Sequence, residues 1–129
     1  MKLELYVTHE KPLEPNRYID LVARADADTD IIITFYDEDE NTVDITDDEV
    51  YFMVKATPST ADDSASINKK VTTHSTPGSG ETTISLIDTD TASLLGNYIW
   101  QCKIKHDDEW FYVGEGNICF KKSIISRES

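Results

Sequence analysis

The sequence contains little proline and glycine, with four and five residues respectively among 129. Collagen-like and low-complexity chains need a much larger share of both residues, so these classes are excluded. Hydrophobic residues make up 39% of the chain, which is more than a wholly disordered protein contains. The length suits one domain with a single hydrophobic core.

Basic residues are also scarce, with 12 Lys and Arg residues against 25 Asp and Glu residues and a formal net charge of −13. This charge repels phosphate backbones, so we expect no binding of nucleic acid unless the fold gathers a basic patch. The acidity is explained by solubility, and the alternative is a surface that docks onto a basic partner.

Long apolar runs are absent, and no segment approaches the roughly 20 residues that a helix needs to span a bilayer. Residues 1–7 alternate charged and apolar side chains and lack the continuous apolar core of a secretion signal. We therefore expect no contact with a membrane, and synthesis in the cytosol without export by the usual route.

The two cysteines, Cys102 and Cys119, are predicted to remain free thiols. Cys102 has the parity of the apolar residues around it, whereas Cys119 alternates against its apolar neighbours. If the apolar faces are buried, the two thiols point apart and lack disulfide geometry, which fits a reducing compartment. A bulge near Gly114 or Gly116 would reverse this parity.

Metal-site signals are weak. Two turns carry acidic or amide side chains at alternate positions, as a calcium-binding loop does at its start: Asp26, Asp28 and Asp30, and then Asp37, Asp39 and Asn41. Neither turn has the glycine at position six or the glutamate at position twelve of such a loop. We interpret both sets as turn residues, and an adventitious cation site at the second set is the alternative.

Catalytic signals are no stronger. Glu109 and Glu115 stand beside aromatic residues, as the two catalytic carboxylates of a glycosidase do. Because the chain has 25 acidic residues, we attribute this pair to chance. The segment Gly78-Ser79-Gly80-Glu81 leads into a strand and so lacks the helix N-terminus of a phosphate-binding loop. The three histidines lack the spacing of a zinc site, and we interpret them as solvated: His9, His74 and His106. The loop serines do not lie in a G-x-S-x-G turn: Ser59, Ser64, Ser75 and Ser79. We therefore predict no catalytic, cofactor-binding or metal-binding residues.

Strand signals recur about every ten residues, with polar turns between them, which predicts an all-β fold. The pattern favours an antiparallel β-sandwich of seven to eight strands, and a small closed barrel is the alternative. We expect an N-terminal extension at residues 1–16, a sandwich domain at 17–122 and a C-terminal tail at 123–129. The extension is either an edge strand of the domain or an arm that pairs with a neighbouring subunit.

Residues 83–100 form the unit around which the chain is organised: a strand, one helical turn near residues 88–95 and a second strand. Asp88 is suited to cap the turn and Gly96 to end it. Alternation then predicts the apolar face of the second strand: Tyr98, Trp100, Cys102 and Ile104.

The last two strands form a hairpin across residues 107–108. Gly114 and Gly116 inside its second strand mark a bulge or a close backbone approach. Because residues 110–112 are all aromatic, at least one ring must point away from the core. Four residues of this strand are expected to share one face: Trp110, Tyr112, Ile118 and Phe120.

Several segments follow one another in an order that includes a D-L-T-like corner and a strand followed by D-T-x-L and G-x-Y. They are Ile31–Tyr36, Val43-Asp44-Ile45-Thr46, Val50–Lys55, Ile84-Ser85-Leu86, Asp88-Thr89-Asp90-Thr91-Ala92, Leu94, Gly96-Asn97-Tyr98 and Gly116. This order resembles the immunoglobulin-like domain of tailed-phage structural proteins, particularly the N-terminal domain of upper-baseplate proteins and their stand-alone relatives. The resemblance covers residues 20–122.

The resemblance implies a non-enzymatic structural protein of a phage virion, in the tail or baseplate, that needs no cofactor. Its partners would be other tail or baseplate proteins and further copies of itself, and it would be assembled in the host cytoplasm. The expected contact surfaces are residues 1–7 and the exposed half of the strand at Trp110–Val113. The alternative is a receptor- or carbohydrate-binding module that uses exposed aromatic residues and the loop Thr73–Gly80.

Overall fold

The computed structural model describes residues 2–7, 19–25, 28–37, 39–57, 59–61, 64–91 and 94–121, without the side chains of Arg24, Asp88 and Thr89. These residues form eight strands, a 3-10 helix and a short α-helix. The elements are β1 (Lys2–Tyr6), β2 (Leu21–Arg24), β3 (Thr29–Tyr36), β4 (Glu49–Lys55), β5 (Ile67–Val71), η2 (Pro77–Ser79), β6 (Glu81–Leu86), α1 (Asp88–Thr91), β7 (Gly96–His106) and β8 (Glu109–Lys121).

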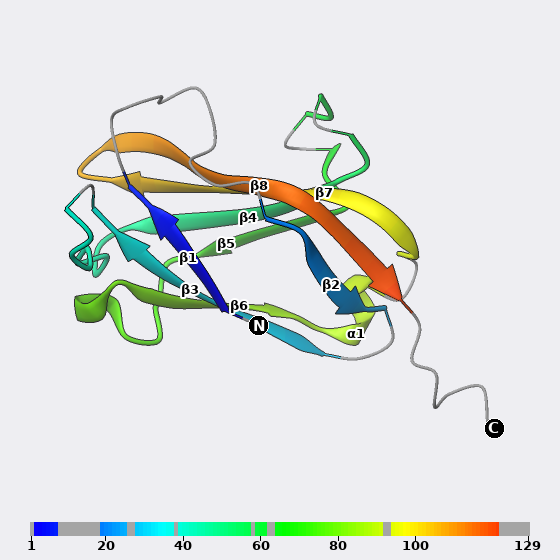
Figure 1. The fold of residues 1–129 in the computed structure, drawn as a ribbon, viewed down its shortest axis with the longest axis horizontal. Coiled ribbons are helices and arrows are strands. Elements are labelled where there is room, and N and C mark those ends of the chain that lie inside the picture. Colours follow the sequence, from blue (N-terminus) through cyan, green and yellow to red (C-terminus); the bar gives the residue numbers. More distant parts are fainter. Residues whose placement is uncertain are drawn as a thin grey trace.

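The strands form two layers, a three-stranded sheet in the order β1-β3-β6 and a five-stranded sheet in the order β2-β8-β7-β4-β5 (Figure 1). The predicted β-sandwich is therefore confirmed. Four strand pairs are antiparallel, whereas β1 on β3 and β2 on β8 are parallel. Both parallel pairs involve an edge strand that no hairpin joins to its neighbour, so the connection does not impose an antiparallel direction.

The core between the sheets is built by the alternation that the sequence predicts. Apolar residues at alternate positions of the described strands are buried in the core: among them are Ile31, Ile33, Phe35, Val50, Phe52, Val54, Ile84, Leu86, Trp100, Cys102 and Ile104. Three residues at the intervening positions of β4 and β7 are buried as well: Met53, Lys55 and Gln101. The Trp100 ring stacks on Phe52, with centroids 5.7 Å apart and planes 10° from parallel. This pair joins β7 to β4 at the centre of the five-stranded sheet.

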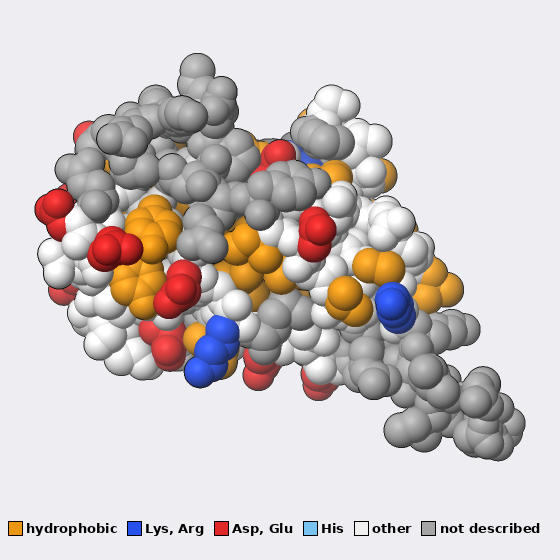
Figure 2. Space-filling model, viewed as in Figure 1, with side chains coloured by type: hydrophobic (Ala, Val, Ile, Leu, Met, Phe, Trp, Pro, Cys, Tyr) orange, Lys and Arg blue, Asp and Glu red, His pale blue; other side chains and the backbone are white. Residues whose placement is uncertain are grey.

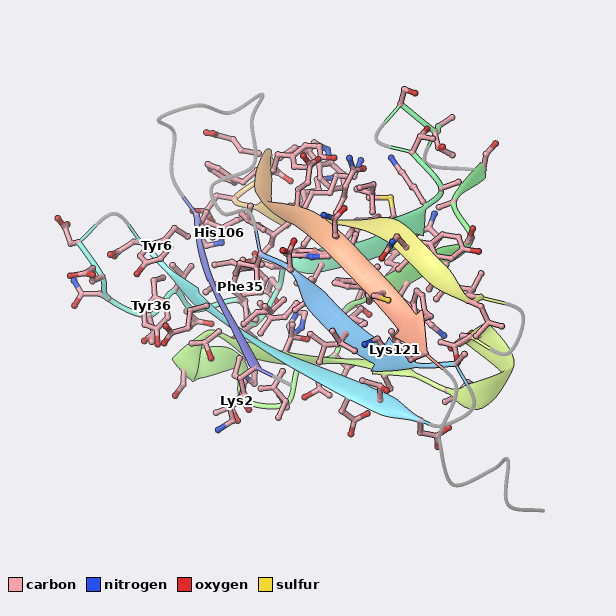
Figure 3. The ribbon with its side chains drawn as sticks, turned by 45° about the vertical axis from the view of Figure 1, so that its right-hand side comes forward. Lys2, Tyr6, Phe35, Tyr36, His106 and Lys121 are labelled. Atoms are coloured by element: carbon pink, nitrogen blue, oxygen red, sulfur yellow. The ribbon has the colours of Figure 1, made fainter. Side chains whose placement is uncertain are left out.

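The N-terminal segment is an edge strand of the small sheet. Leu3, Leu5 and Val7 are buried in the core, and the Val7 N–H donates to the Tyr36 carbonyl at 2.7 Å. Tyr6 and Tyr36 lie side by side on the outer face of β1 and β3 (Figure 3), with ring centroids 5.7 Å apart. Within the described residues 2–7, the segment pairs with β3 of its own chain, so β1 adds to the sandwich although it precedes residue 17, where the domain was expected to begin.

The chain approaches β8 closely at Ile19, just before β2. The Ile19 N–H donates to the Glu115 carbonyl at 2.9 Å, and the Ile19 carbonyl accepts the Trp100 indole N–H at 2.7 Å. A Cβ at Gly116 would lie 1.8 Å from the Ile19 carbonyl oxygen, so only glycine fits between the two backbones. This is the close approach that a glycine inside the strand predicted.

A β-bulge interrupts the β7–β8 hairpin. Cys102 pairs with Gly114 but Lys103 pairs with Tyr112, so Val113 has no partner in the ladder. The extra residue reverses the parity of the strand on its two sides.

The predicted common face of Trp110, Tyr112, Ile118 and Phe120 is therefore wrong for its first two members. Ile118 and Phe120 are buried, whereas Trp110 is 47% exposed and Phe111 occupies the core in its place. The expectation that one ring of the aromatic triplet points outward is confirmed for Trp110.

The unit between β6 and β7 contains the predicted helical turn as α1, and Gly96 has the positive φ of 94° where β7 begins. The Asp90 carboxylate accepts the Ile87 N–H at 3.0 Å. The predicted cap by Asp88 concerns a side chain that the structure does not describe.

Within the described ranges, no helix is long and apolar enough to cross a membrane.

The two cysteines are free, with Cys102 fully buried and Cys119 partly exposed, as their parity predicted. Burial raises the pKa of the Cys102 thiol well above its usual value.

Gly116→Ala should destabilise the protein, because its Cβ would displace the Ile19 carbonyl and break the two hydrogen bonds at Ile19. We expect the free energy of unfolding to fall by about 2–4 kcal/mol. Urea denaturation followed by tryptophan fluorescence measures this change. Gly78→Ala is the matched control, since a Cβ there meets no atom within 4 Å. Equal stability of the two variants would contradict the close approach.

Ellman's reagent should modify Cys119 in the native protein and Cys102 only after unfolding. The Cys102 thiol is enclosed in the core, and its raised pKa keeps the reactive thiolate scarce. In Cys119→Ser the rapid native reaction should disappear. The prediction is wrong if that variant still reacts rapidly without denaturant.

Candidate interaction surface

Lysine and aromatic side chains gather on the outer face of the five-stranded sheet, although the chain as a whole is acidic. We call this group the lysine–aromatic patch, and it consists of Tyr51, Lys70, Lys103, Lys105 and Trp110. Strand register brings its members together, because Tyr51 pairs with both Lys70 and Lys103, and Lys105 pairs with Trp110. On the face seen in Figure 2, carboxylates are spread widely and basic side chains are few.

The rings and ammonium groups of the patch hold one another in place. The Trp110 ring centroid lies 5.2 Å from that of Tyr51. Lys103 Nζ and Lys105 Nζ lie 5.2 Å and 5.8 Å from the Trp110 centroid, and Lys70 Nζ lies 5.8 Å from the Tyr51 centroid. At these distances each cation is attracted by the ring quadrupole. The patch therefore presents an exposed indole with two lysine ammonium groups beside it.

Glu49 partly neutralises the patch at its edge. The Tyr51 hydroxyl donates to Glu49 Oε1 at 2.9 Å, and Lys70 Nζ lies 3.7 Å from the same oxygen. The hydrogen bond from Tyr51, with the charges of Lys70 and Lys105, lowers the pKa of Glu49. The hydrogen bond with Tyr51 and the charge of Glu49 raise the pKa of Lys70.

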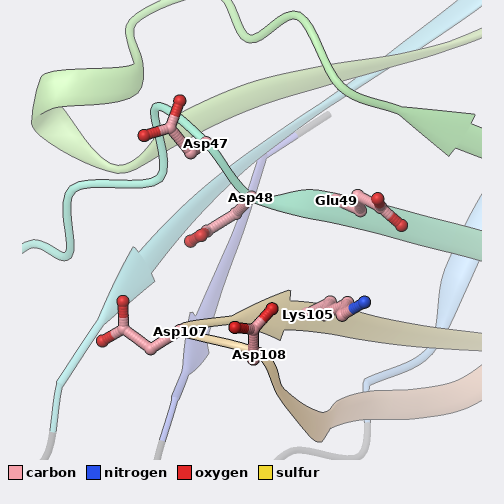
Figure 4. A pocket seen from close by; sticks show the side chains of 6 residues that line it. All are labelled: Asp47, Asp48, Glu49, Lys105, Asp107 and Asp108. Carbon is pink, nitrogen blue, oxygen red and sulfur yellow. The ribbon is translucent and has the colours of Figure 1, made fainter.

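An acidic end lies beside the patch, where the β7–β8 hairpin meets the corner before β4. Its carboxylates belong to Asp44, Asp47, Asp48, Asp107 and Asp108. A shallow pocket joins most of this end to the patch (Figure 4), since its lining consists of Asp47, Asp48, Glu49, Lys105, Asp107 and Asp108.

Two histidines of the acidic end contact Asp48. His106 Nδ1 lies 2.6 Å from Asp48 Oδ2, while His74 joins the Asp48 carbonyl to the Thr82 hydroxyl through two contacts of 2.8 Å. The interpretation of His74 as solvated is wrong, because these contacts satisfy both ring nitrogens in a buried position. His106 is partly buried, and His9 lies outside the described residues.

The other acidic turn is structural, as interpreted from the sequence. The Asp37 carboxylate accepts the N–H groups of Asp39 and Asn41 at 2.9 Å and 3.0 Å. Asp28 and Asp30 are exposed near the start of β3, and Asp26 lies outside the described residues. In the part of the chain that the structure describes, no group of three or more His, Cys, Asp or Glu side chains is arranged to hold a metal ion.

The structure does not bring the two glutamates of β8 together. Glu109 pairs with His106 at the hairpin end, whereas Glu115 pairs with Gln101 and accepts its amide N–H at 3.0 Å. The loop serines are exposed: Ser59, Ser64, Ser75 and Ser79. The segment Gly78–Glu81 continues from η2 into β6, as expected.

The contact surface expected at Trp110–Val113 overlaps the lysine–aromatic patch at Trp110, but its lysines and Tyr51 were not predicted from the sequence. The alternation of Lys103 and Lys105 with buried Ile104 was the available signal. It was incomplete because Lys70 comes from a distant strand and because the bulge at Val113 reverses the parity that would have placed Trp110 inside.

No protein-family model matches the sequence, and no curated protein sequence matches it. Among solved structures, the chain is similar to one described as the N-terminal domain of phage TP901-1 ORF48. The identity is 11% and the TM-score is 0.54, over 95% of this chain and 100% of that chain. At this level of identity, the similarity shows a shared fold alone.

Asp48 should titrate above the usual aspartate pKa and Asp44 below it. Burial raises the pKa of Asp48 despite the contact with His106, whereas hydrogen bonds from the Thr46 hydroxyl and N–H lower the pKa of Asp44. Asp48 therefore favours the folded state at low pH, and this contribution is lost as the pH rises through its folded pKa. Asp44 has the opposite sign, and its contribution is lost as the pH falls through its folded pKa.

Carbon-13 NMR titration of the carboxyl groups measures both values. Thr46→Val should raise the pKa of Asp44 because it removes the hydroxyl donor. Thr72→Val, at an exposed threonine, is the control. An unchanged Asp44 titration in Thr46→Val would contradict the assignment.

Proposed function

We propose that the chain is a non-enzymatic structural component of a tailed-phage particle, in its tail or baseplate, that acts through protein–protein packing. The observation that carries this proposal is the structural similarity to the phage TP901-1 ORF48 domain over nearly the whole chain. The order of sequence motifs described above supports the same family independently of the coordinates.

The strand order supports an immunoglobulin-like classification. In immunoglobulin-like sandwiches, the B and E strands share one sheet, and C, F and G form the other, which C′ extends in variable-type domains. Here β3 and β6 share the small sheet, and β5-β4-β7-β8 run in the corresponding order in the large one. The parallel addition of β2 to β8 completes the large sheet at its other edge.

A non-enzymatic role is supported by the way the reactive groups are used. In the Asp48–His106 pair, the second imidazole nitrogen lies 3.4 Å from the exposed Asp107 carboxylate, where a catalytic pair would present a hydroxyl or thiol nucleophile. The Cys102 thiol is enclosed in the core. These groups are engaged in contacts within the fold.

In this role the chain would bind other tail or baseplate proteins, without contact to nucleic acid or membrane, and would be located in virions assembled in the host cytoplasm. The apolar side of β1 is used in its own core. What β1 offers a partner is its outer face. There Glu4 accepts the hydroxyl of Tyr36 from β3 at 3.2 Å, and the Tyr6 ring lies against the Tyr36 ring. The lysine–aromatic patch is the second such surface.

One observation favours carbohydrate binding as a second candidate function. Trp110 is half exposed and lies against Tyr51, and saccharide rings stack on exposed aromatic side chains. A glycan array on the purified protein separates the two candidates, because a packing surface has no saccharide preference.

The proposed function predicts that the chain is present in purified phage particles. Phage particles from the organism that encodes the chain are purified on a density gradient. The particle fractions should contain both the chain and the tail proteins, and mass spectrometry detects both. Deletion of its gene should leave particles with incomplete tails under the electron microscope. Absence of the chain from intact, infectious particles would overturn the proposal.

A further inference from the structure

Charge is ordered along the outer face of the β7–β8 hairpin. Asp107 and Asp108 form its tip, the pair of Lys105 and Trp110 follows, and Lys103 comes next along β7. Lys70 extends the positive end across β4 to β5. The exposed indole therefore stands between a negative end and a positive end on one face.

Both charged ends are accessible to a partner. The Asp107 side chain is 87% exposed and that of Lys70 is 52% exposed. Trp110 between them is 47% exposed, and a partly buried tryptophan in the middle of a charged surface has the character of an interface anchor. A partner that covers this face must present a positive group, an apolar group and a negative group in that order along its surface.

A second copy of the chain meets this requirement. A two-fold axis near Trp110 would turn one copy so that its acidic tip faces Lys70 and Lys103 of the other copy, and the reverse contact would form by symmetry. The same rotation would bring the two Trp110 rings to the centre of the contact. We propose that the lysine–aromatic patch and the hairpin tip form an isologous homodimer interface, a proposal that rests on the packing role proposed above.

A second copy fits the observations better than a nucleic acid does. The net charge of −13 repels a phosphate backbone, and Glu49 and the hairpin tip place carboxylates directly beside the lysines. Repulsion between two acidic copies is screened beyond about 8 Å at physiological salt, so the charges in direct contact decide the orientation. Those charges are complementary when the two faces oppose each other across a two-fold axis.

Charge reversal on each side of the contact tests the proposal by sedimentation velocity on the full chain. The wild type should be a dimer at about 100 μM, where an interface of micromolar affinity is mostly occupied. Lys70→Glu with Lys103→Glu should raise the dissociation constant by at least about 10-fold, because each copy then opposes like charges. Asp107→Lys with Asp108→Lys should have the same effect from the hairpin tip.

Mixing the two reversed variants should restore a dimer. One variant then has acidic groups at both ends of the interface and the other has lysines at both ends, so opposite charges meet at both halves of the contact. Lys2→Glu with Lys121→Glu is the matched control, because it makes the same change in net charge at exposed positions outside the patch. Circular dichroism and thermal melting establish that each variant is folded.

A monomeric wild type overturns the proposal, and so does a mixture that sediments as monomers. Either result leaves the proposed function intact if the chain is found in purified particles. Conversely, a dimer restored by mixing supports the interface even if the chain is absent from virions.

Discussion

The fold depends most on the contacts of the Trp100 side chain. Its ring is fully buried, stacks on Phe52 and donates its indole N–H to the Ile19 carbonyl. Gly114 leaves room for the ring, since a Cβ there would lie 2.8 Å from it. One side chain thus joins the centre of the large sheet to the segment that enters β2. Without the indole donor, the Ile19 carbonyl would lose a hydrogen bond inside the protein, a loss worth about 1–3 kcal/mol.

The glycines and the bulge of β8 link this core to the surface. The backbone at Gly114 and Gly116 accommodates Trp100 and Ile19, and the extra residue Val113 lies immediately before them. Because the bulge reverses parity, the strand buries its apolar residues on both sides of the glycines but directs Trp110 outward. The exposed indole that anchors the proposed interface is therefore a geometric consequence of how the core is closed.

The charges of the protein are arranged locally despite the large negative total. Lysines surround two aromatic rings on one sheet face, and carboxylates gather at the adjacent hairpin end. Within that end, burial raises the pKa of Asp48 while hydrogen bonds from Thr46 lower that of Asp44. A surface of this kind suits directional packing between proteins, because complementary charges exclude most alternative orientations.

Alternation in the sequence determined the class of the fold, most of its strands, the inward faces of β3, β4 and β7, and the free thiols. The helical turn followed from residues suited to begin and end a helix. These features are local, since side-chain direction in a strand follows from a period of two. Only the tertiary structure decided that β1 and β2 add in parallel to different sheets, that His74 is buried, and that Lys70 joins Trp110 on one face. Each of these depends on contacts between residues far apart in the chain, and the outward direction of Trp110 also depends on the bulge at Val113. No local pattern specifies such contacts.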